Sequence, residues 1–592
     1  MASPHTFHIP VMGTAFTADS ALKVAHYGIN TVIALADDVL LERLREYYSR
    51  LYNLSYKEIK KDTKDYRANR ITSYLNMVNK IALSRYEEFI SSTKEKFDEI
   101  KTYFNMLPDT SDIKHEFNKL TQDTVSFEDL SSWLKNNLSI GNIDVNIMTK
   151  VDKTNYFKKE KLPSEYNDAH AGLRGYANSD LESSVIFSAG MNPRLYGYIA
   201  KFDDFFPDKE GYIKKKIILK VSDFRSAIIQ GKFLAKKGLW VSEYRIESGL
   251  NCGGHAFATE GFLMGPILAE FRDRRQELID DTFEICKSAL KVQGKIIPDK
   301  KLNIKITAQG GVATSEEHNF LINHYNLDTV GWGTPFLLVP EATTVDKGTR
   351  KQLIQAKEKD LYLSNISPLG VPFNSLRNSS KDIERFQKIA EGNPGSACPR
   401  KFLALSNEYG TEGVCTASRL FQYNKIQEKG ISDEITEKTC LCMGLAASSV
   451  INYKFDTRES KGVSICPGPN MAYFSKELSL SEMVHHIYND LKEVVRMDRP
   501  NMFVNELGMY LKYFSEKIKE HKENWTTKSE KQLNNFADNM NNGVLYYQEM
   551  FSSIGEYFSN KKESIDNSLD DAMNSLKKMR SEISSLINQN QK

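Results

Sequence analysis

Long hydrophobic runs are absent from this sequence. None of its apolar stretches approaches the roughly 18 residues that a membrane-spanning helix needs. The opening MASPHTFHIPVMG also lacks the basic segment and the apolar segment of a secretory signal. We therefore expect a cytoplasmic protein that has no membrane as a partner.

Cysteine is scarce, and neither sign of charge is in excess. Seven cysteines in 592 residues are too few for a disulfide framework, so in a reducing compartment they are thiols, metal ligands or catalysts. Lys and Arg number 79 and Asp and Glu number 77, which leaves a formal net charge of +2. This balance gives no reason to expect nucleic acid as a partner. We expect a small-molecule substrate instead.

Strand-like runs recur along the first 345 residues and alternate with helical stretches. Eight such runs stand out: FHIPVMG (7–13), TVIALA (31–36), DVNIMTK (144–150), SVIFSAG (184–190), KIILKVS (216–222), VSEYRIESG (241–249), LNIKITAQGG (302–311) and DTVGWGTPFLL (328–338). Eight strands that alternate with helices favour a closed parallel barrel over an open sheet. We predict an α/β fold, a (β/α)8 TIM barrel formed by residues 1–36 and 141–345.

The remaining parts differ in character from the barrel. Residues 37–140 are rich in Lys, Glu, Tyr and Leu at helical spacing and predict a helical insertion. Residues 346–495 are irregular and hold five of the seven cysteines. Residues 496–592 predict two or three long amphipathic helices, whose apolar face suits a bundle or a homo-oligomer contact. We expect the insertion and the irregular segment to form a cap over the barrel mouth.

Two glycine-containing loops follow the seventh and eighth predicted strands. Gly310 and Gly311 end the first, and Gly333 and Thr334 lie in the second. In TIM barrels these two loops commonly bind a phosphate, because glycine lets backbone N–H groups approach it closely. Either pair alone is also ordinary turn chemistry; together they predict a phosphate-binding site.

The stretch NCGGH (251–255) follows the sixth predicted strand and places His255 at the barrel mouth. An imidazole has an unperturbed pKa near 6.5, which suits proton transfer. The alternative is a structural histidine. The position favours a catalytic role for His255.

These motifs together resemble a known family. SGLNCGGH (248–255), ITAQGGVAT (306–314) and VGWGTPFLLVPEA (330–342), with FHIPVMG at the first strand, are similar to the nitronate monooxygenases, also called 2-nitropropane dioxygenases. The resemblance implies a barrel that binds FMN, with His255 as the proton-transfer group. It implies that Met12 and Gly13 line the flavin, that Asn146 approaches it from the third strand, and that Gly249, Gly253 and Gly254 border the isoalloxazine ring or the ribityl chain, with Ser248 beside them. It assigns the phosphate to Gly310, Gly311, Gly333 and Thr334.

Two further positions bear on this hypothesis, and the first departs from the family pattern. Ser248 stands where the family has a glutamine that often contacts the flavin. Lys220 lies on the fifth predicted strand, and its position there points it toward the flavin N1/O2 edge. A cation at that edge stabilises the reduced cofactor.

Three functions follow from these patterns. The first is an FMN-dependent oxidoreductase that acts on a small carbon acid, with the substrate or NAD(P)H as electron donor. The second is an enoyl reductase of fatty acid or polyketide synthesis, which needs a pyridine nucleotide. The third is a redox-inactive barrel that serves as a binding scaffold.

The cysteines of the irregular segment form a separate candidate site. Cys398, Cys415, Cys440, Cys442 and Cys466 have the spacing C-x16-C-x24-C-x-C-x23-C. Four of them could hold an iron–sulfur cluster or a zinc ion, although no C-x2-C pair is present. Free thiols in packed loops are the other interpretation.

Overall fold

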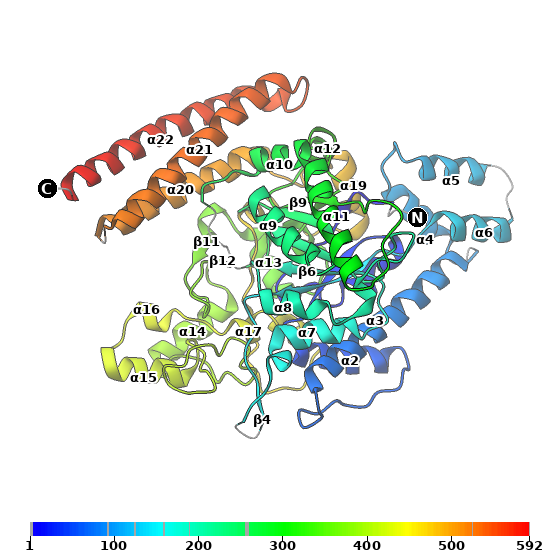
Figure 1. The fold of residues 1–592 in the computed structure, drawn as a ribbon, viewed down its shortest axis with the longest axis horizontal. Helices are drawn as coiled ribbons and strands as arrows, with labels where there is room; N and C mark the ends of the chain where they lie inside the picture. Colours follow the sequence, from blue (N-terminus) through cyan, green and yellow to red (C-terminus); the bar gives the residue numbers. More distant parts are fainter. Residues whose placement is uncertain are drawn as a thin grey trace.

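The computed structural model describes residues 4–91, 94–122, 126–157, 160–188, 190–254, 260–523 and 525–590. Its central sheet has eight parallel strands in the order β1-β10-β9-β8-β7-β6-β3-β2. The strands are β1 (Phe7–His8), β2 (Thr31–Ala34), β3 (Ile143–Met148), β6 (Ser184–Ser188), β7 (Lys216–Val221), β8 (Val241–Glu247), β9 (Lys305–Gln309) and β10 (Thr329–Gly331). One parallel bridge, His8 to Asn30, joins the two edge strands, so the sheet nearly closes. The predicted (β/α)8 barrel is confirmed (Figure 1).

The barrel interior is partly apolar and partly charged. Val32, Ile186 and Ile218 form a small buried cluster of their own, against which Val11 packs. Beside it, the buried Arg245 guanidinium forms ion pairs with Glu243 and Asp144. Charged groups tolerate such burial only when they are paired. The polar side chains at the strand ends therefore rest on a filled barrel.

Helices follow the strands and cover the outside of the barrel, as the sequence pattern predicts. They are α1 (Ser20–Val24), α3 (Tyr66–Ser91), α7 (Asp168–Ala177), α8 (Pro193–Ile199), α9 (Phe224–Ala235), α10 (Met264–Asp273), α11 (Arg275–Val292) and α12 (Ser315–His324). Side-chain caps define where they begin. The Asp223 carboxylate accepts a hydrogen bond from Ser226 N at 2.6 Å before α9, and Thr314 Oγ1 accepts one from Glu317 N at 3.2 Å before α12.

The insertion is helical, but most of it lies away from the barrel mouth. Besides α3 it contains α2 (Asp38–Leu51), α4 (Phe97–Met106), α5 (Asp112–Gln122) and α6 (Phe127–Asn137). The Tyr103 ring of α4 packs edge-on against His5, which precedes β1. Helices α4 to α6 therefore lie at the amino-terminal end of the barrel, where α4 packs against α19 (Leu480–Asn489), and on the other side of the molecule from residues 361–436 (Figure 1). The cap expected from 37–140 is not formed by these helices, because their apolar side chains pack at that end.

Parts of residues 346–495 do line the barrel mouth. They include α13 (Lys347–Gln355), the antiparallel pair β11 (Leu361–Ser364) and β12 (Phe373–Leu376), and several short helices. These helices are α14 (Ser380–Ala390), α15 (Arg419–Lys429), α16 (Asp433–Thr436), α17 (Leu441–Gly444), α18 (Ala447–Asn452) and α19 (Leu480–Asn489). A second small hairpin, β4 (Tyr156–Phe157) with β5 (Glu160–Lys161), follows β3.

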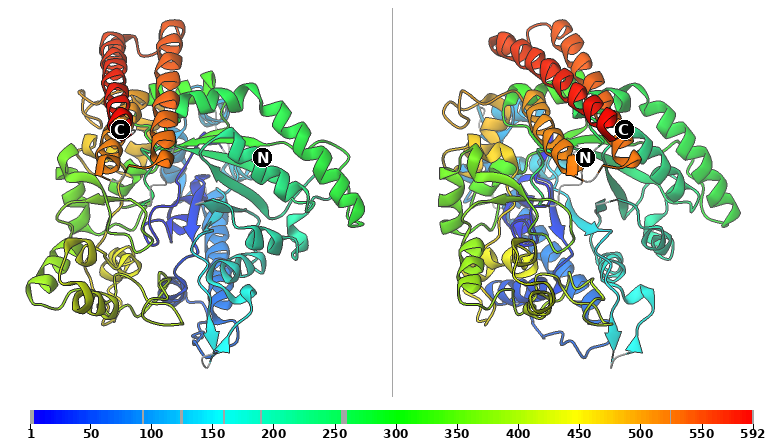
Figure 2. Two further views of the ribbon diagram at one scale, coloured as in Figure 1. Left: turned by 60° about the vertical axis from the view of Figure 1, so that its left-hand side comes forward. Right: turned by 90° about the vertical axis from the view of Figure 1, so that its left-hand side faces the viewer.

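Three long helices follow, as predicted for the C-terminal region. They are α20 (Met502–Glu523), α21 (Thr527–Ser553) and α22 (Lys562–Asn590), and they lie side by side next to the barrel (Figure 2). Their apolar side chains are buried within the chain: Phe514 of α20 stacks on Phe536 of α21, and Leu576 of α22 is 1% exposed. The apolar face therefore forms a bundle. Self-association through these helices stays a prediction.

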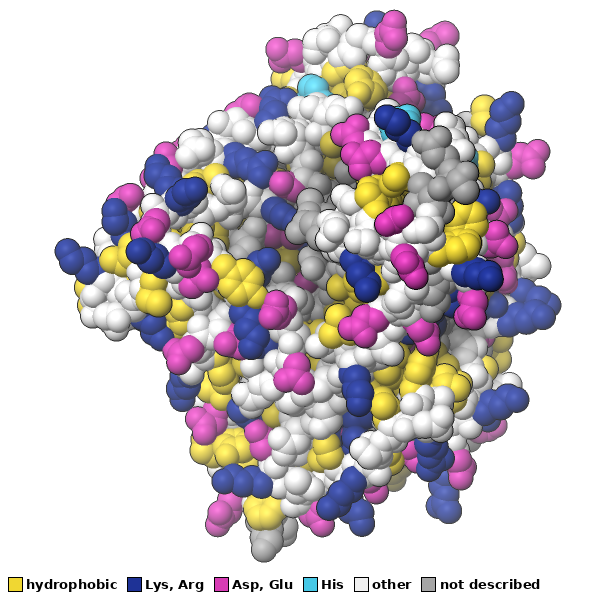
Figure 3. All heavy atoms as spheres, turned by 90° about the vertical axis from the view of Figure 1, so that its right-hand side faces the viewer, with side chains coloured by type: hydrophobic (Ala, Val, Ile, Leu, Met, Phe, Trp, Pro, Cys, Tyr) yellow, Lys and Arg dark blue, Asp and Glu magenta, His cyan; other side chains and the backbone are white. Residues whose placement is uncertain are grey.

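The surface agrees with the near-neutral composition. Basic and acidic side chains are interspersed over the face drawn in Figure 3, without a gathering of one sign. Among the described residues, every helix is too short or too polar to cross a membrane.

A buried carboxyl joins the C-terminal helices to the barrel. Glu506 of α20 accepts hydrogen bonds from Ser248 Oγ at 2.8 Å and from Met264 N at 2.9 Å. Burial raises the pKa of the Glu506 carboxyl to about 7, and these hydrogen bonds oppose the shift. At low pH the carboxyl is therefore neutral in the folded protein, and at high pH the fold must hold a buried charge.

This carboxyl predicts a pH-dependent stability. The folded-state pKa lies above the ordinary 4.5, so the stability that neutral Glu506 contributes is complete below about pH 4.5 and is lost as the pH rises through about 7. Glu506→Gln stays neutral. We expect the free energy of unfolding of the wild type, relative to this variant, to fall by roughly 3 kcal/mol over that interval. Denaturant titrations at several pH values measure it.

The matched control is Glu520→Gln on the same helix, because the Glu520 side chain is 61% exposed. Its stability relative to the wild type should change little over the same pH range. If the difference in the free energy of unfolding between the wild type and Glu506→Gln also stays constant over this pH range, the raised pKa assigned to Glu506 is wrong.

Candidate active site at the barrel mouth

A cavity of about 1050 Å³ lies at the carboxyl ends of the strands. Residues at or after β1, β2, β3, β6, β7 and β8 line one side of it, and the β11–β12 hairpin, residues 467–473 and α20 line the other. This is the end of a (β/α)8 barrel at which active sites are built. From residues 37–140 only Asp37 contributes to the lining that the described chain provides.

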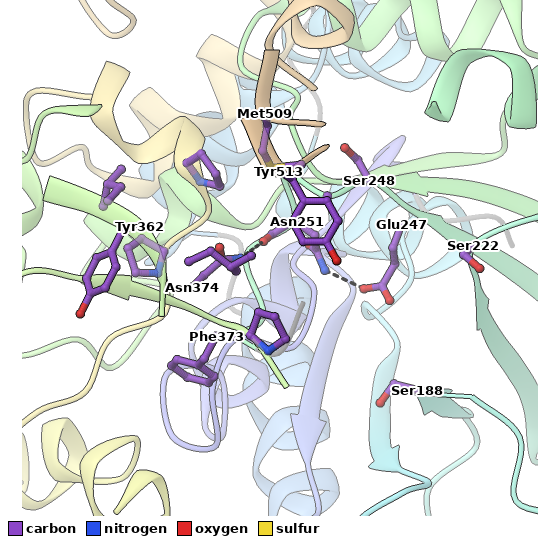
Figure 4. A pocket seen from close by; sticks show the side chains of 18 of the residues that line it. Ser188, Ser222, Glu247, Ser248, Asn251, Tyr362, Phe373, Asn374, Met509 and Tyr513 are labelled. Carbon is purple, nitrogen blue, oxygen red and sulfur yellow. Dashed lines mark hydrogen bonds between the residues drawn. The ribbon is translucent and has the colours of Figure 1, made fainter. Parts of the chain in front are cut away.

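The floor of the cavity carries an ion pair. Lys220 Nζ of β7 lies 2.9 Å from Glu247 Oε1 at the end of β8, and the lysine side chain is only 6% exposed. The same carboxylate oxygen accepts a hydrogen bond from Asn251 Nδ2 at 2.6 Å (Figure 4) and one from Gln309 Nε2 at 3.2 Å. Three donors therefore hold this carboxylate oxygen in place, and one of them, Lys220, also balances its charge.

Asn146 of β3 adds an acceptor beside this pair. Its Nδ2 donates a weak hydrogen bond to Ser188 Oγ at 3.4 Å. Its buried Oδ1 has no hydrogen-bond partner among the described residues. Because a buried amide oxygen without a partner is costly, a ligand with an N–H or O–H donor is favoured at this position.

The rim is formed by the hairpin and by α20, and it is more apolar. Figure 4 shows Tyr362, Phe373 and Asn374 on one side and Met509 and Tyr513 on the other. Asn374 N donates to Gly254 O at 2.8 Å, and Asn374 Nδ2 to Asn251 O at 3.4 Å. The hairpin is thus attached to the loop that follows β8.

Most residues that the sequence analysis placed at the flavin ring do lie together. The following line the cavity: Gly13, Asn146, Lys220, Ser248, Gly249, Gly253 and Gly254. Met12 does not; it is fully buried and its backbone N donates to Thr17 Oγ1. His255 lies outside the described residues, because 255–259 are not among them.

The four residues predicted to bind a phosphate do not line the cavity. Neither Gly310 nor Gly311 lines the cavity, because the loop that follows β8 lies against both. A Cβ atom at Gly310 would lie 2.8 Å from Asn251 Cα, and one at Gly311 would lie 2.9 Å from Leu250 Cδ1. Glycine is needed here for close approach of the chain to itself, and the φ values of +109° and +88° also favour it.

The second glycine loop is covered as well. A Cβ atom at Gly333 would lie 3.3 Å from Cys252 Cβ, and one at Gly468 would lie 2.9 Å from Thr334 Oγ1. The start of α12 is also engaged, since Ser315 N donates to Asp490 Oδ1 at 2.6 Å. Protein groups therefore pack against both glycine loops, and one N–H group at the start of α12 is already engaged.

FMN in the pose that the resemblance implies consequently fits only in part. The ring positions face a cavity with a buried cation and an unpartnered amide oxygen. The phosphate positions are filled by residues 250–252 and by Gly468.

The five candidate metal-binding cysteines do not form one set. Cys466 lies beside Cys252, whose Sγ donates to Cys466 O at 3.3 Å. Cys398, Cys415, Cys440 and Cys442 gather elsewhere and interact with one another. In the described part of the chain, no group of three or more His, Cys, Asp or Glu could hold a metal ion as placed.

Glu247 was not among the residues predicted from the sequence, although a signal was present. Glu243, Arg245 and Glu247 alternate along β8, so three charged residues share one face of a buried strand. That face points into the barrel, where Arg245 forms its ion pairs. Met509 and Tyr513 had no comparable signal, because α20 is about 260 residues away from Ser248 along the chain.

Known proteins share little similarity with this chain. No family model matches this chain, and no curated protein matches it. Among solved structures, one match is the crystal structure of the enoyl reductase domain of MlnA from the macrolactin biosynthesis cluster of Bacillus amyloliquefaciens. It is 12% identical, covers 71% of this chain and 88% of that chain, and has a TM-score of 0.30. The assignment of the barrel therefore depends on its own strand order, and the resemblance to nitronate monooxygenases stays a prediction.

Proposed function

We propose that this chain is an oxidoreductase that binds a flavin-type ring and an organic substrate together in the barrel-mouth cavity. One observation carries the proposal: the ring positions implied by the resemblance, apart from Met12, line a single cavity that also contains Lys220. Its volume of about 1050 Å³ is at the upper end of ordinary ligand sites, which leaves room for two molecules. A bound flavin supplies electron and hydride exchange.

The chain's own groups have distinct parts in this proposal. Lys220 is the buried cation, and an anionic or electron-rich ligand atom competes with Glu247 for it. Asn251 and Gln309 keep Glu247 in place when Lys220 turns to a ligand. Asn146 Oδ1 accepts from a ligand donor, which orients the ring. His255 is proposed as the proton-transfer group on sequence grounds alone.

The position of the cofactor phosphate differs from the one that the resemblance implies. With both glycine loops covered, the basic side chains that line the described cavity besides Lys220 are Lys150, Arg377 and Lys512. We propose that a phosphate-bearing ligand directs its phosphate to this rim rather than to Gly310 and Gly333.

Enoyl reduction is the second candidate, and the apolar rim favours it. Leu361, Leu363 and Phe373 of the hairpin line the cavity, and so do Phe402 and Tyr513. A long apolar wall suits an acyl chain better than a small nitronate. NAD(P)H is then the electron donor.

Binding of FMN to the purified protein tests the proposal, with flavin fluorescence as the measurement. Lys220→Met should weaken binding by roughly tenfold or more, since a charge-assisted contact is lost. Thr334→Val should change affinity by less than about twofold, because Thr334 is covered by Gly468. The matched control is Lys232→Met, which removes a 2.8 Å ion pair from the surface.

Two outcomes would contradict different parts of the proposal. Protein that neither contains nor takes up FMN contradicts the flavin proposal and favours the redox-inactive scaffold. A loss of affinity in Thr334→Val that equals the loss in Lys220→Met contradicts the proposed phosphate position.

The role of His255 has a separate test. His255→Ala should leave FMN bound and slow its anaerobic reduction by roughly 10²–10⁴, the usual contribution of an acid or base. Stopped-flow absorbance with a nitronate, and with NAD(P)H followed by an enoyl thioester, measures the reduction and separates the two reaction classes. Unchanged reduction rates remove His255 from the mechanism.

A further inference from the structure

Ser248 lies between the barrel-mouth cavity and a buried carboxyl of α20. The residue lines the cavity, and its Oγ lies 2.8 Å from Glu506 Oε1, which is a hydrogen-bond distance. The same hydroxyl oxygen accepts a hydrogen bond from Leu250 N at 3.1 Å. Glu506 is only 2% exposed. The carboxyl therefore acts on a ligand in the cavity through the Ser248 hydroxyl.

Contacts on both of its oxygens hold the Glu506 carboxyl against Ser248. Oε2 accepts hydrogen bonds from Met264 N at 2.9 Å and from Tyr547 Oη at 3.4 Å. Helix α20 also packs tightly on the loop after β8, since a Cβ atom at Gly249 would lie 2.2 Å from Met509 Cε. The pair therefore stays together whether the carboxyl is neutral or ionised.

The same contacts decide which oxygen of Glu506 carries the proton when the carboxyl is neutral. A backbone N–H group only donates, so Met264 N keeps Oε2 as an acceptor. Oε1 faces the Ser248 hydroxyl, which both donates and accepts. The Tyr547 hydroxyl is more distant from its oxygen, at 3.4 Å. The proton therefore belongs on Oε1, from which the neutral carboxyl donates to Ser248 Oγ.

This proton decides the direction in which the Ser248 hydroxyl donates. A hydroxyl has one donor hydrogen and two acceptor lone pairs. When Glu506 is neutral, Glu506 and Leu250 N occupy both lone pairs, so the Ser248 hydrogen is left for an acceptor in the cavity. When Glu506 is ionised, the Ser248 hydrogen is donated to the carboxylate. A ligand then meets a lone pair instead of a donor.

The surroundings place this change near neutral pH. Burial raises the pKa of the Glu506 carboxyl to about 7, and its hydrogen bonds oppose the shift. The titratable group that faces it from α21 is Tyr547, which stays neutral because burial raises the pKa of that hydroxyl well above its usual value. From α10 it meets the backbone of Met264, and from the loop after β8 it meets Ser248. The Ser248 oxygen points away from the neighbouring Glu247 carboxylate, which belongs to the ion pair on the cavity floor (Figure 4).

We propose that Ser248 binds an acceptor atom of the ligand as a hydrogen-bond donor, and that Glu506 is the positioning residue that makes it one. A carbonyl oxygen or an unprotonated ring nitrogen is such an acceptor. Ligand binding is then tighter when Glu506 is protonated, and it weakens as the pH rises through about 7. That the ligand is a flavin-type ring rests on the proposed function, whereas the contact between Ser248 and Glu506 does not.

The pH dependence of FMN affinity tests this inference, with flavin fluorescence as the measurement. The amide introduced by Glu506→Gln donates to Ser248 at every pH. The dissociation constant of the wild type, divided by that of Glu506→Gln, should therefore rise roughly tenfold between about pH 6 and about pH 8. The FMN phosphate also titrates in this range, but it does so in both proteins and cancels in the ratio.

Ser248→Ala removes the group through which Glu506 acts. It should weaken FMN binding at about pH 6 by roughly fivefold, the value of one hydrogen bond. The ratio between Ser248→Ala and the double variant Ser248→Ala/Glu506→Gln should not change with pH. Glu520→Gln is the matched control, because this glutamate of α20 is 61% exposed, and it should bind FMN as the wild type does. Circular dichroism identifies any variant that fails to fold.

Infrared difference spectra of the ligand-free protein test the pair itself, because a neutral carboxyl has a C=O stretch that a carboxylate lacks. The band that is missing in Glu506→Gln should disappear from the wild type through about pH 7. In Ser248→Ala it should persist to higher pH, since the ionised carboxyl loses a donor.

Two results would overturn the inference: an infrared titration that is unchanged in Ser248→Ala, or a constant ratio of FMN affinities between the wild type and Glu506→Gln. Wild-type protein that takes up no FMN at any pH contradicts the proposed function instead. The infrared titration then still decides whether Ser248 and Glu506 are coupled.

Discussion

One buried ion pair organises the C-terminal half of this protein around the barrel. The fully buried Arg499 guanidinium lies 2.7 Å from Glu317 Oε1 of α12 and donates to Gly311 O at 2.6 Å and to Asn470 Oδ1 at 2.8 Å. The same glutamate oxygen accepts from Met502 N, the first residue of α20, at 2.7 Å. Removal of either charge would leave the other buried without a partner, which is among the costliest changes in a protein interior. These contacts therefore fix the start of α20 relative to the barrel.

That position decides where a ligand can bind. Arg499 and Asn470 both hold the Gly311 carbonyl, so the loop after β9 is packed against protein and does not face a cavity. Helix α20, fixed at its first residue, then brings Met509 and Tyr513 over the ends of β7 and β8. The Arg499–Glu317 ion pair therefore has two effects. It packs protein against the loop after β9, where (β/α)8 barrels commonly bind a phosphate, and it positions α20, which forms part of the cavity rim.

The sequence predicts what depends on local pattern and misses what depends on distant partners. Strand periodicity located all eight strands, and the inward position of Lys220 followed from its strand. Gly310 and Gly311 have the same appearance in sequence whether a phosphate or another chain segment approaches them, so the pattern could not distinguish the two. Arg499 is 188 residues from its contact at Gly311, and no local spacing records that pairing.

The cysteines illustrate the same limit. Five cysteines in one irregular segment do not reveal which of them meet; the fold takes Cys466 to the loop after β8 and leaves four together. Arg400, two residues after Cys398, forms an ion pair with Asp37, donates to Cys442 O at 3.4 Å and pairs with Glu459 at 2.7 Å. Asp37 lines the cavity and caps α2 by accepting from Leu40 N. A single guanidinium therefore fixes the segments around Cys398 and Cys442 to the end of β2, so this wall of the cavity is held in place by one buried charge.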